Sequence, residues 1–189
     1  MPIFLVRHGE TRLTGAFCGS SDPGLTPKGR AQARRAARQL SKFSIDRCYC
    51  SPLLRTRQTA AIAARRVKRP VIVKAALREL DFGRWEGLRF PDIEKQWPTL
   101  ASRWAKDPMS VRIPGSESFI ALRERVKRFL TAIMKKPLQD SAILIVGHGG
   151  SLAAIVLELL RLPNKEFPKH IPAPGSVRRI DGGNMQVLC

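Results

Sequence analysis

Short apolar runs alternate with amphipathic stretches along most of the chain. Four of these apolar runs are short and are bounded by turn residues, which predicts buried strands in residues 2–6 (PIFLV), 45–50 (IDRCYC), 70–75 (PVIVKA) and part of 140–150 (DSAILIVGHGG). Helix start signals follow three of them, with Thr26, Ser51 and Ser151 as expected N-caps and proline after the first two. The first two helices are expected to end near residues 43 and 66. A final pair of strands is predicted at residues 176–180 and 184–188, joined by Asp-Gly-Gly.

This alternation predicts an α/β fold, namely a three-layer α/β/α sandwich with a mostly parallel central sheet. Residues 81–136 interrupt it. They contain a long helix from about Ser118, with apolar side chains on one side: Phe119, Leu122, Val126, Phe129, Leu130 and Ile133. We expect residues 1–189 to form a single domain in which residues 81–136 are a helical insertion over the carboxyl ends of the strands, where α/β proteins bind ligands.

A formal net charge of +19 makes the chain attractive to anions. In the helix after Thr26, Arg30, Arg34 and Arg38 recur every four residues opposite an alanine-rich stripe, which is typical of a solvated basic face. The other basic residues are scattered, without a basic arm or tail. We therefore expect a small phosphorylated substrate and no nucleic-acid partner, while the oligomeric state stays open.

The N-terminal MPIFLVRHGE lacks the basic segment of a signal peptide, and no run of about 18 apolar residues follows. We expect a cytoplasmic protein that does not contact a membrane. The cysteines, Cys18, Cys48, Cys50 and Cys189, form no CxxC pair. We expect reduced thiols, with Cys48 and Cys50 on one face of a strand, and neither a bound metal nor a cofactor.

Charged side chains follow the predicted strands close to where each strand ends. Arg7 and His8 follow the first strand, and Arg55 follows the second by a few residues. Glu79 comes after the third strand, and His148 ends the fourth. Because the carboxyl ends of parallel strands meet at one edge of a sheet, these five side chains are expected to converge there.

Together they suit phosphoryl transfer. A neutral His8 has a lone pair with which to attack phosphorus. Arg7 and Arg55 can each offer forked donors to the phosphoryl oxygens, and His148 can supply another. Glu79 can protonate the leaving alcohol and then activate water to break the phosphohistidine. On this hypothesis arginine charge serves where other phosphoryl-transfer enzymes use divalent cations.

Five motifs, in order along nearly the whole chain, resemble those of the histidine phosphatase superfamily, also called phosphoglycerate-mutase-like. They read LVRHGET, CSPLLRTRQTA, LRELDFGRWEG, IPGSESF and VGHGG. The resemblance implies that His8 is the phosphorylated nucleophile and that Glu79 is the proton donor. It also implies that Arg7, Arg55 and His148 complete the phosphate pocket.

The resemblance places Cys18, Gly19, Gly149 and Gly150 along the substrate pocket. Thr14 stands where many relatives carry Asn, with a hydroxyl of shorter reach. Within the superfamily, the short loop after the first motif and the LRELDFGRWEG segment resemble the α-ribazole phosphatases most. That resemblance implies removal of the 5′-phosphate from α-ribazole phosphate, or from cobalamin phosphate, in cobalamin biosynthesis.

Other interpretations stay open on the sequence alone. The chain could be a broad-specificity histidine phosphatase, a phosphoglycerate mutase or a phosphoprotein phosphatase. It could also be a non-catalytic module that binds phosphate or nucleic acid. The insertion holds Trp85, Trp97 and Trp104. The favoured interpretation is that they pack its own core, and the alternative is that one stacks on a benzimidazole base.

Overall fold

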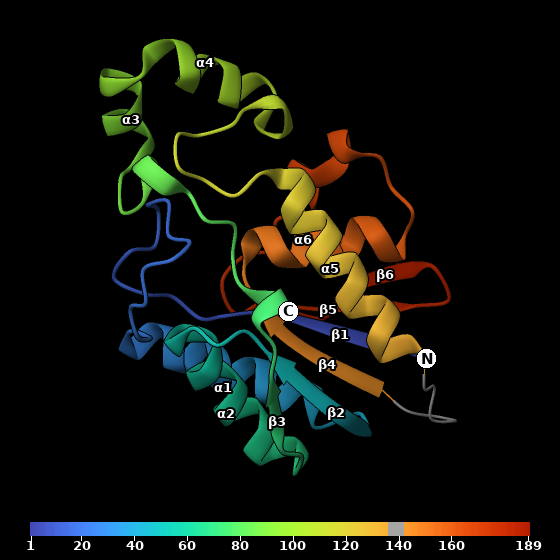
Figure 1. The fold of residues 1–189 in the computed structure, drawn as a ribbon. Coiled ribbons are helices and arrows are strands. Elements are labelled where there is room, and N and C mark those ends of the chain that lie inside the picture. The colour runs from blue at the N-terminus through green and yellow to red at the C-terminus, as the bar shows by residue number, and fades with distance from the viewer. Residues whose placement is uncertain (136–141) are drawn as a thin grey trace.

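The computed structural model describes residues 1–135 and 142–189, and a six-stranded sheet lies at its centre (Figure 1). The strands are β1 (Ile3–Arg7), β2 (Ile45–Cys50), β3 (Val71–Val73), β4 (Ala142–Gly147), β5 (Val177–Asp181) and β6 (Asn184–Val187). Their order is β3-β2-β4-β1-β5-β6. The first four in this order pair in parallel, whereas β5 and β6 pair antiparallel. The mostly parallel sheet and its closing strand pair are confirmed; residues 140 and 141 of the predicted fourth run lie outside the described residues.

Helices cover both faces of this sheet, which confirms the three-layer architecture. α1 (Pro27–Leu40) and α2 (Leu54–Val67) pack on one face, over a core that includes Phe4 and Leu144. α5 (Phe119–Met134) and α6 (Gly149–Leu159) pack on the other, over a core that includes Leu5 and Ile145. Successive residues of β4 and of β1 up to Val6 alternate between the two cores, so both central strands are apolar along nearly their whole length.

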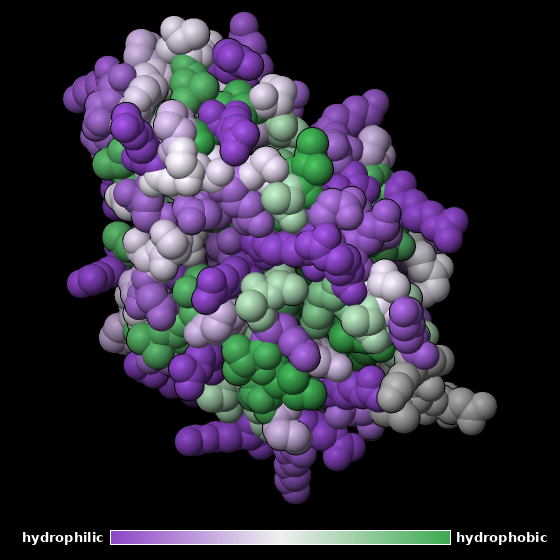
Figure 2. Space-filling model, in the orientation of Figure 1, coloured by the Kyte–Doolittle hydropathy of each residue, from purple (hydrophilic) through white to green (hydrophobic). Residues whose placement is uncertain are grey.

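The outer surface is mainly hydrophilic on the face seen in Figure 2. A hydrophobic patch lies over the short edge strand β3, where Ile72 and Val73 are 39% and 47% exposed. The described part of the chain contains no helix long and apolar enough to cross a membrane. Cys48 and Cys50 are buried in the same core as free thiols, so they share a face of β2 as predicted.

The start signal at Thr26 is confirmed, because its side chain accepts a hydrogen bond from the Gly29 N–H at 3.0 Å. The prediction for Ser51 is wrong: α2 begins at Leu54, and the Ser51 hydroxyl bonds to His148 instead. Ser151 is not an N-cap either. α6 begins at Gly149 with His148 as N-cap, and the Ser151 hydroxyl accepts the His148 N–H at 3.1 Å.

Part of the predicted insertion, residues 83–113, covers the carboxyl edge of the sheet, and we call it the covering segment. It consists of η2 (Gly83–Trp85), α3 (Phe90–Gln96), α4 (Pro98–Lys106) and η3 (Pro108–Ser110). Its small core holds Trp85, Ile93, Ala101 and Ile113. α5 was predicted to belong to the insertion. It packs instead with α6 on the sheet, because its apolar stripe faces the core between these two helices and the sheet. The predicted end at residue 136 lies outside the described residues, and the single-domain organisation stays a prediction.

Candidate active site

The ends of β1 and β4 bring two histidines together. Arg7 lies opposite Gly147 in the parallel register, so the residues that follow them, His8 and His148, are neighbours. The His8 N–H donates to the Gly147 carbonyl at 3.0 Å, and the two imidazole centroids lie 5.1 Å apart. The convergence expected from the strand order is thus a direct result of the register.

His8 is buried and has one ring nitrogen engaged. Its Nδ1 lies 2.8 Å from the Gly9 carbonyl oxygen. Because a carbonyl only accepts, this contact assigns the proton to Nδ1 and leaves the lone pair on Nε2. The pKa of His8 is lowered from 6.5 to about 3, mainly by burial and also by the charges of Arg55 and Arg7, while the bond to Gly9 opposes the shift. His8 is therefore a neutral imidazole with a free Nε2 near pH 7.

The loop that carries His8 is pressed against α1. A Cβ on Gly9 would lie 2.2 Å from the Gly29 carbonyl oxygen, and a Cβ on Gly29 would lie 2.1 Å from that of Glu10. Only glycine allows such a close approach of two backbones. The Gly9 N–H also donates to Thr59 Oγ1 of α2 at 3.2 Å. Both helices of this layer therefore fix the backbone next to His8.

Behind His8 lies a fully buried trio of Arg55, His148 and Ser51. Arg55 Nε donates to His148 Nδ1 at 3.2 Å. The proton of His148 is thereby assigned to Nε2, which donates to Ser51 Oγ at 2.9 Å. Burial, together with His8 and the nearby arginines, lowers the pKa of His148 well below its ordinary value. His148 is thus a neutral ring held at both nitrogens.

Arg55 also organises the loop in front of α2. Its Nη2 donates to the carbonyls of Cys18 and Gly19, each at 3.1 Å, and its Nη1 donates to the Ser21 carbonyl at 2.5 Å. All three guanidinium nitrogens are therefore bound to protein atoms. In this arrangement Arg55 shapes the wall of the site and orients His148.

Arg7 has a different environment. Its Nη1 donates to the Pro172 carbonyl at 2.7 Å, and its Nε is buried with no hydrogen-bond partner among the described residues. Burial lowers the pKa of Arg7, and the Glu79 carboxylate opposes that shift. A buried donor without a partner is costly in a protein. Nη2 also has no partner among the described residues, and because it is not buried as Nε is, it is the nitrogen that an anion in the cavity can reach.

Glu79 reaches the site from the segment after η1 (Ala75–Leu77). Its Oε1 accepts the N–H groups of Leu80 at 2.9 Å and Ser151 at 3.1 Å, and its Oε2 accepts that of Gly150 at 2.9 Å. The first turn of α6 therefore holds the carboxylate. A carboxylate has about four acceptor positions, so one on Oε2 remains for a proton or a water molecule.

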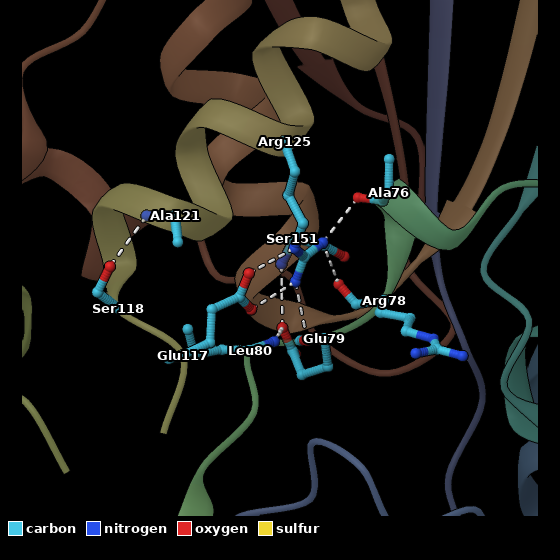
Figure 3. A network of polar contacts seen from close by, with 9 residues as sticks. All are labelled: Ala76, Arg78, Glu79, Leu80, Glu117, Ser118, Ala121, Arg125 and Ser151. Atoms are coloured by element: carbon cyan, nitrogen blue, oxygen red, sulfur yellow. Dashed lines mark hydrogen bonds and ion pairs between the residues drawn. The ribbon is translucent and has the colours of Figure 1, made fainter. Parts of the chain in front are cut away.

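An arginine of α5 fixes the backbone that carries Glu79 (Figure 3). Arg125 Nη1 donates to the carbonyls of Ala76 and Arg78 at 2.7 and 2.9 Å, and Nη2 donates to that of Glu79 at 3.0 Å. Its remaining contacts are two bonds to the Glu117 carboxylate, at 2.7 and 2.8 Å. Arg125 thus joins the IPGSESF turn, α5 and the Glu79 segment.

A cavity of about 370 Å³ opens in front of these groups. It contains Arg7, His8 and Glu79 in its wall, whereas Arg55 and His148 lie behind the wall. Aromatic side chains line much of the remainder: Phe17, Phe82, Trp104 and Phe167. This volume and this mixture of charged and aromatic groups suit a small anionic ligand with an apolar part.

Most of the predicted substrate-binding residues, Thr14, Cys18, Gly149 and Gly150, line the cavity. Gly19 does not. It borders a neighbouring groove, and its N–H donates to the Glu86 carboxylate at 3.0 Å. No three His, Cys, Asp or Glu side chains in residues 1–135 and 142–189 lie close enough to hold a metal ion.

The tryptophans divide between the two predicted interpretations. Trp85 is fully buried in the core of the covering segment, and Trp97 packs against that core. Trp104 packs on Trp85, with ring centroids 5.3 Å apart, and it also lines the cavity. One tryptophan is therefore in a position to contact a bound ligand.

Sequence reasoning missed Ser51 and Arg125 as parts of the site. Ser51 carries a helix-start signal that hides its bond to His148. Arg125 lies on the amphipathic α5, where an arginine at a half-buried position gives no distinct signal. Glu117, eight residues before Arg125, indicated their ion pair only weakly in the sequence. The two side chains face each other only because the chain turns just before Ser118, where α5 begins.

Comparison with known proteins agrees with this geometry. The chain is 32% identical over 167 residues to phosphoserine phosphatase 1 of Hydrogenobacter thermophilus, covering 87% of this chain and 79% of that protein. The α-ribazole phosphatase of Shigella flexneri superposes with a TM-score of 0.86 at 28% identity, over 99% of this chain and 94% of that one. A mycobacterial glucosyl-3-phosphoglycerate phosphatase in complex with VO3 superposes with a TM-score of 0.89 at 27% identity, over 98% and 96%.

A probable phosphoglycerate mutase of Salmonella choleraesuis is also 33% identical over 165 residues, covering 86% of this chain and 76% of that protein. These relatives act on different phosphate esters, so they support phosphatase or mutase-like activity without selecting one substrate. The family model of the histidine phosphatase superfamily (branch 1) matches residues 3–187. The resemblance in the five motifs is thereby confirmed. This chain belongs to the histidine phosphatase superfamily.

Proposed function

We propose that the protein is a phosphomonoesterase that works through a phosphohistidine on His8, without a metal. The observation that carries the proposal is that the neutral Nε2 of His8 and the Nη2 of Arg7, both without a partner among the described residues, belong to side chains that line one cavity. One group can attack phosphorus, and the other can hold a phosphoryl oxygen. The cavity contains both.

In the first step, His8 Nε2 attacks phosphorus while the ester P–O bond breaks. The new bond is N–P, and the departing alkoxide takes a proton from Glu79. Arg7 stabilises the charge on the non-bridging oxygens as it is spread in the transition state. Arg55 and His148 act behind the wall, by holding the loop at residues 18–21 and the edge of the sheet in place.

In the second step, Glu79 takes a proton from a water molecule whose oxygen attacks the phosphohistidine. The N–P bond breaks, His8 returns to its neutral form and inorganic phosphate leaves. The N–H groups of Leu80, Gly150 and Ser151 hold the same carboxylate in both steps. They keep it close to the leaving oxygen and to the attacking water in turn.

The proposed substrate is α-ribazole 5′-phosphate, or the corresponding cobalamin phosphate, in cobalamin biosynthesis. Two observations support it. The aromatic wall of Phe17, Phe82 and Trp104 offers faces for a flat benzimidazole base. The structural relatives include an α-ribazole phosphatase over nearly the whole of both chains. A cytoplasmic location stays a prediction that goes with this pathway.

The test is steady-state hydrolysis of a panel with EDTA present. The panel contains α-ribazole 5′-phosphate, phosphoserine, 3-phosphoglycerate and a phosphopeptide. A preference of about tenfold in kcat/KM for α-ribazole phosphate, about 1.4 kcal/mol of transition-state discrimination, supports the substrate. A clear preference for another member, or equal rates on all, overturns it. Formation of 2-phosphoglycerate would identify a mutase.

The intermediate has its own test. A rapid quench with labelled substrate should trap an acid-labile, base-stable phosphoprotein, which is the behaviour of a phosphoramidate bond. The label should be absent from the His8→Ala variant. Turnover without labelling under conditions that trap other phosphohistidines would overturn the covalent route.

A further inference from the structure

The α1–α2 layer has the most one-sided charge of any region of the protein. We use the name α1–α2 basic face for its exposed basic side chains, which are Lys28, Arg30, Arg34, Arg35 and Arg38 on α1 and Arg57, Arg65 and Arg66 on α2. Neither helix contains an Asp or a Glu. The two helices lie side by side over one face of the sheet (Figure 1), so their charges share one outer surface. Folding has brought together charge that looks scattered along the chain.

Most of this charge is not neutralised within the protein. Lys28 pairs with Glu10 at 2.8 Å, but within the described ranges none of the seven arginines of the face forms a salt bridge. What distinguishes the face is that its arginines have no Asp or Glu on either helix, whereas Arg123 on α5 pairs with Glu158 of the adjacent α6. An unpaired row of guanidinium groups attracts anions at long range and binds phosphates as a fork.

The spacing of the face fits a repeated anion better than a single one. Arg30, Arg34 and Arg38 form a row with one side chain per turn of α1, which extends about 12 Å along the helix axis. On α2, Arg57 and Arg65 lie two turns apart, with Ala61 between them. Duplex nucleic acid presents one phosphate charge about every 1.7 Å of its axis, so several phosphates can meet this surface together.

Other partner classes fit less well. Protein interfaces and peripheral membrane sites both need apolar anchors beside the charge. On α1 and α2 the exposed side chains that are not basic are Pro27, Ala31, Leu54 and Ala61, and Leu54 is 39% exposed at the very start of α2. The face also lacks aromatic side chains on which single-stranded bases could stack.

We propose that the α1–α2 basic face binds the phosphate backbone of double-stranded nucleic acid, without reading its sequence. This proposal departs from the expectation of no nucleic-acid partner, because the packing of α1 beside α2 gathers charges that the sequence shows only as scattered. The surface shares no residue with the wall of the catalytic cavity. This proposal is therefore independent of the phosphatase activity, and both ligands can be bound at once.

The experiment is fluorescence anisotropy of the full chain with a labelled duplex of about 20 base pairs over a series of salt concentrations. We expect log Kd to rise linearly with log salt concentration. The variant R30Q/R34Q/R38Q should bind at least about tenfold more weakly at low salt, and its salt slope should be smaller by about 2–3, since each phosphate contact contributes about 0.9. A duplex of unrelated sequence should bind equally well.

The matched control is R103Q/K106Q/R112Q, which removes the same charge from exposed positions of the covering segment. It should keep the wild-type slope and bind within about twofold of wild type, because it loses net charge but no phosphate contact. Circular dichroism melts verify that both variants are folded. Equal weakening of the two would show diffuse attraction by net charge and would overturn the proposal.

Two further arms address alternative anion sites. Vanadate, a phosphoryl mimic for the cavity, should not displace the duplex; displacement would place the binding at the catalytic site and overturn the proposal. Vesicles of phosphatidylcholine with phosphatidylserine should bind more weakly than the duplex at equal phosphate concentration. Tighter binding to the vesicles, or no duplex binding at about 0.15 M salt, would also overturn it.

Discussion

The catalytic edge holds two arginine–histidine pairs in opposite surroundings. Arg7 and His8 line the cavity, and each has at least one side-chain nitrogen without a partner among the described residues. Arg55 and His148 lie directly behind them, fully buried, with every guanidinium nitrogen and both imidazole nitrogens engaged. The same residue types therefore have different roles, because the front pair can act on a ligand and the rear pair fixes the geometry around it.

Replacing the front histidine tests this division most strongly. His8→Ala should lower kcat at least about 10³-fold, because the attacking lone pair is lost. The matched control is His170→Ala, at the end of η4 (Asn164–His170) and outside the cavity wall, which should stay within about twofold of wild type. A His8→Ala enzyme with near-normal turnover would mean that the front pair does not perform the chemistry.

The two arginines should separate activity from stability. Arg7→Gln should lower kcat/KM by about 10²-fold, with little change in melting temperature, because it removes a donor to the transition state. Arg55→Gln deprives His148 and three carbonyls of their donor, so it should cost about 2–4 kcal/mol of stability. For a chain of this size that corresponds to roughly 5–15 °C. Kinetics and thermal melts of both variants would decide, and the reverse pattern would exchange the roles of the two pairs.

A glycine supports the front of the site from α6. A Cβ at position 150 would lie 2.5 Å from Glu79 Oε1, so Gly150→Ala should push the carboxylate aside rather than distort the backbone. We expect kcat to fall by about tenfold or more with a nearly unchanged melt. The control is the same change in a Glu79→Gln background. In that background Gly150→Ala should lower kcat little further. If the two losses in kcat were fully additive, the alanine would act through a route other than Glu79.

Protonation of the histidines gives a dependence of stability on pH. The pKa of His8 is about 3 when folded, against 6.5 as its ordinary value, so the unfolded chain binds more protons between these values. This contribution is complete above pH 6.5. As the pH falls from 6.5 toward about 3, preferential protonation of His8 in the unfolded chain lowers the free energy of unfolding by up to about 1.4 kcal/mol per pH unit. His148 acts in the same direction.

Urea unfolding of wild type and His8→Ala at several pH values measures this effect. The variant should show the shallower dependence below pH 6.5. Activity should behave differently, since the nucleophile remains neutral in the folded state. An acid limb of kcat/KM centred at 6.5, matched by the same midpoint in an NMR titration of the His8 ring in the wild-type protein, would contradict the assigned protonation.

The alternation of strands and helices and the motif positions were sufficient to predict the fold and the convergence of Arg7, His8, Glu79 and His148. Both follow from parallel register, which is encoded locally by apolar runs and by the residues after them. The depth of Arg55 could not be predicted, because its partners are carbonyls of the loop at residues 18–21. Ser51 was misjudged for a related reason, because a serine that suits an N-cap equally suits a tertiary bond to His148. Ser151 was misplaced by three residues: it is the N3 residue of α6, and its hydroxyl accepts the backbone N–H of His148, the true N-cap.

The smallest expected effect concerns the aromatic wall. A change there should alter binding of the organic group without altering the phosphoryl chemistry of Arg7 and His8. Trp104→Leu should lower kcat/KM for α-ribazole phosphate about fivefold more than for phosphoserine, because a ring contact is worth about 1 kcal/mol. Trp97→Leu is the matched control, since Trp97 belongs to the same segment but does not line the cavity. Equal losses on both substrates in Trp104→Leu would indicate a disturbed fold of the covering segment. The proposed substrate would then be supported only by the structural similarity to an α-ribazole phosphatase. A wall that does not distinguish an aromatic ester from an aliphatic one does not select for the benzimidazole base.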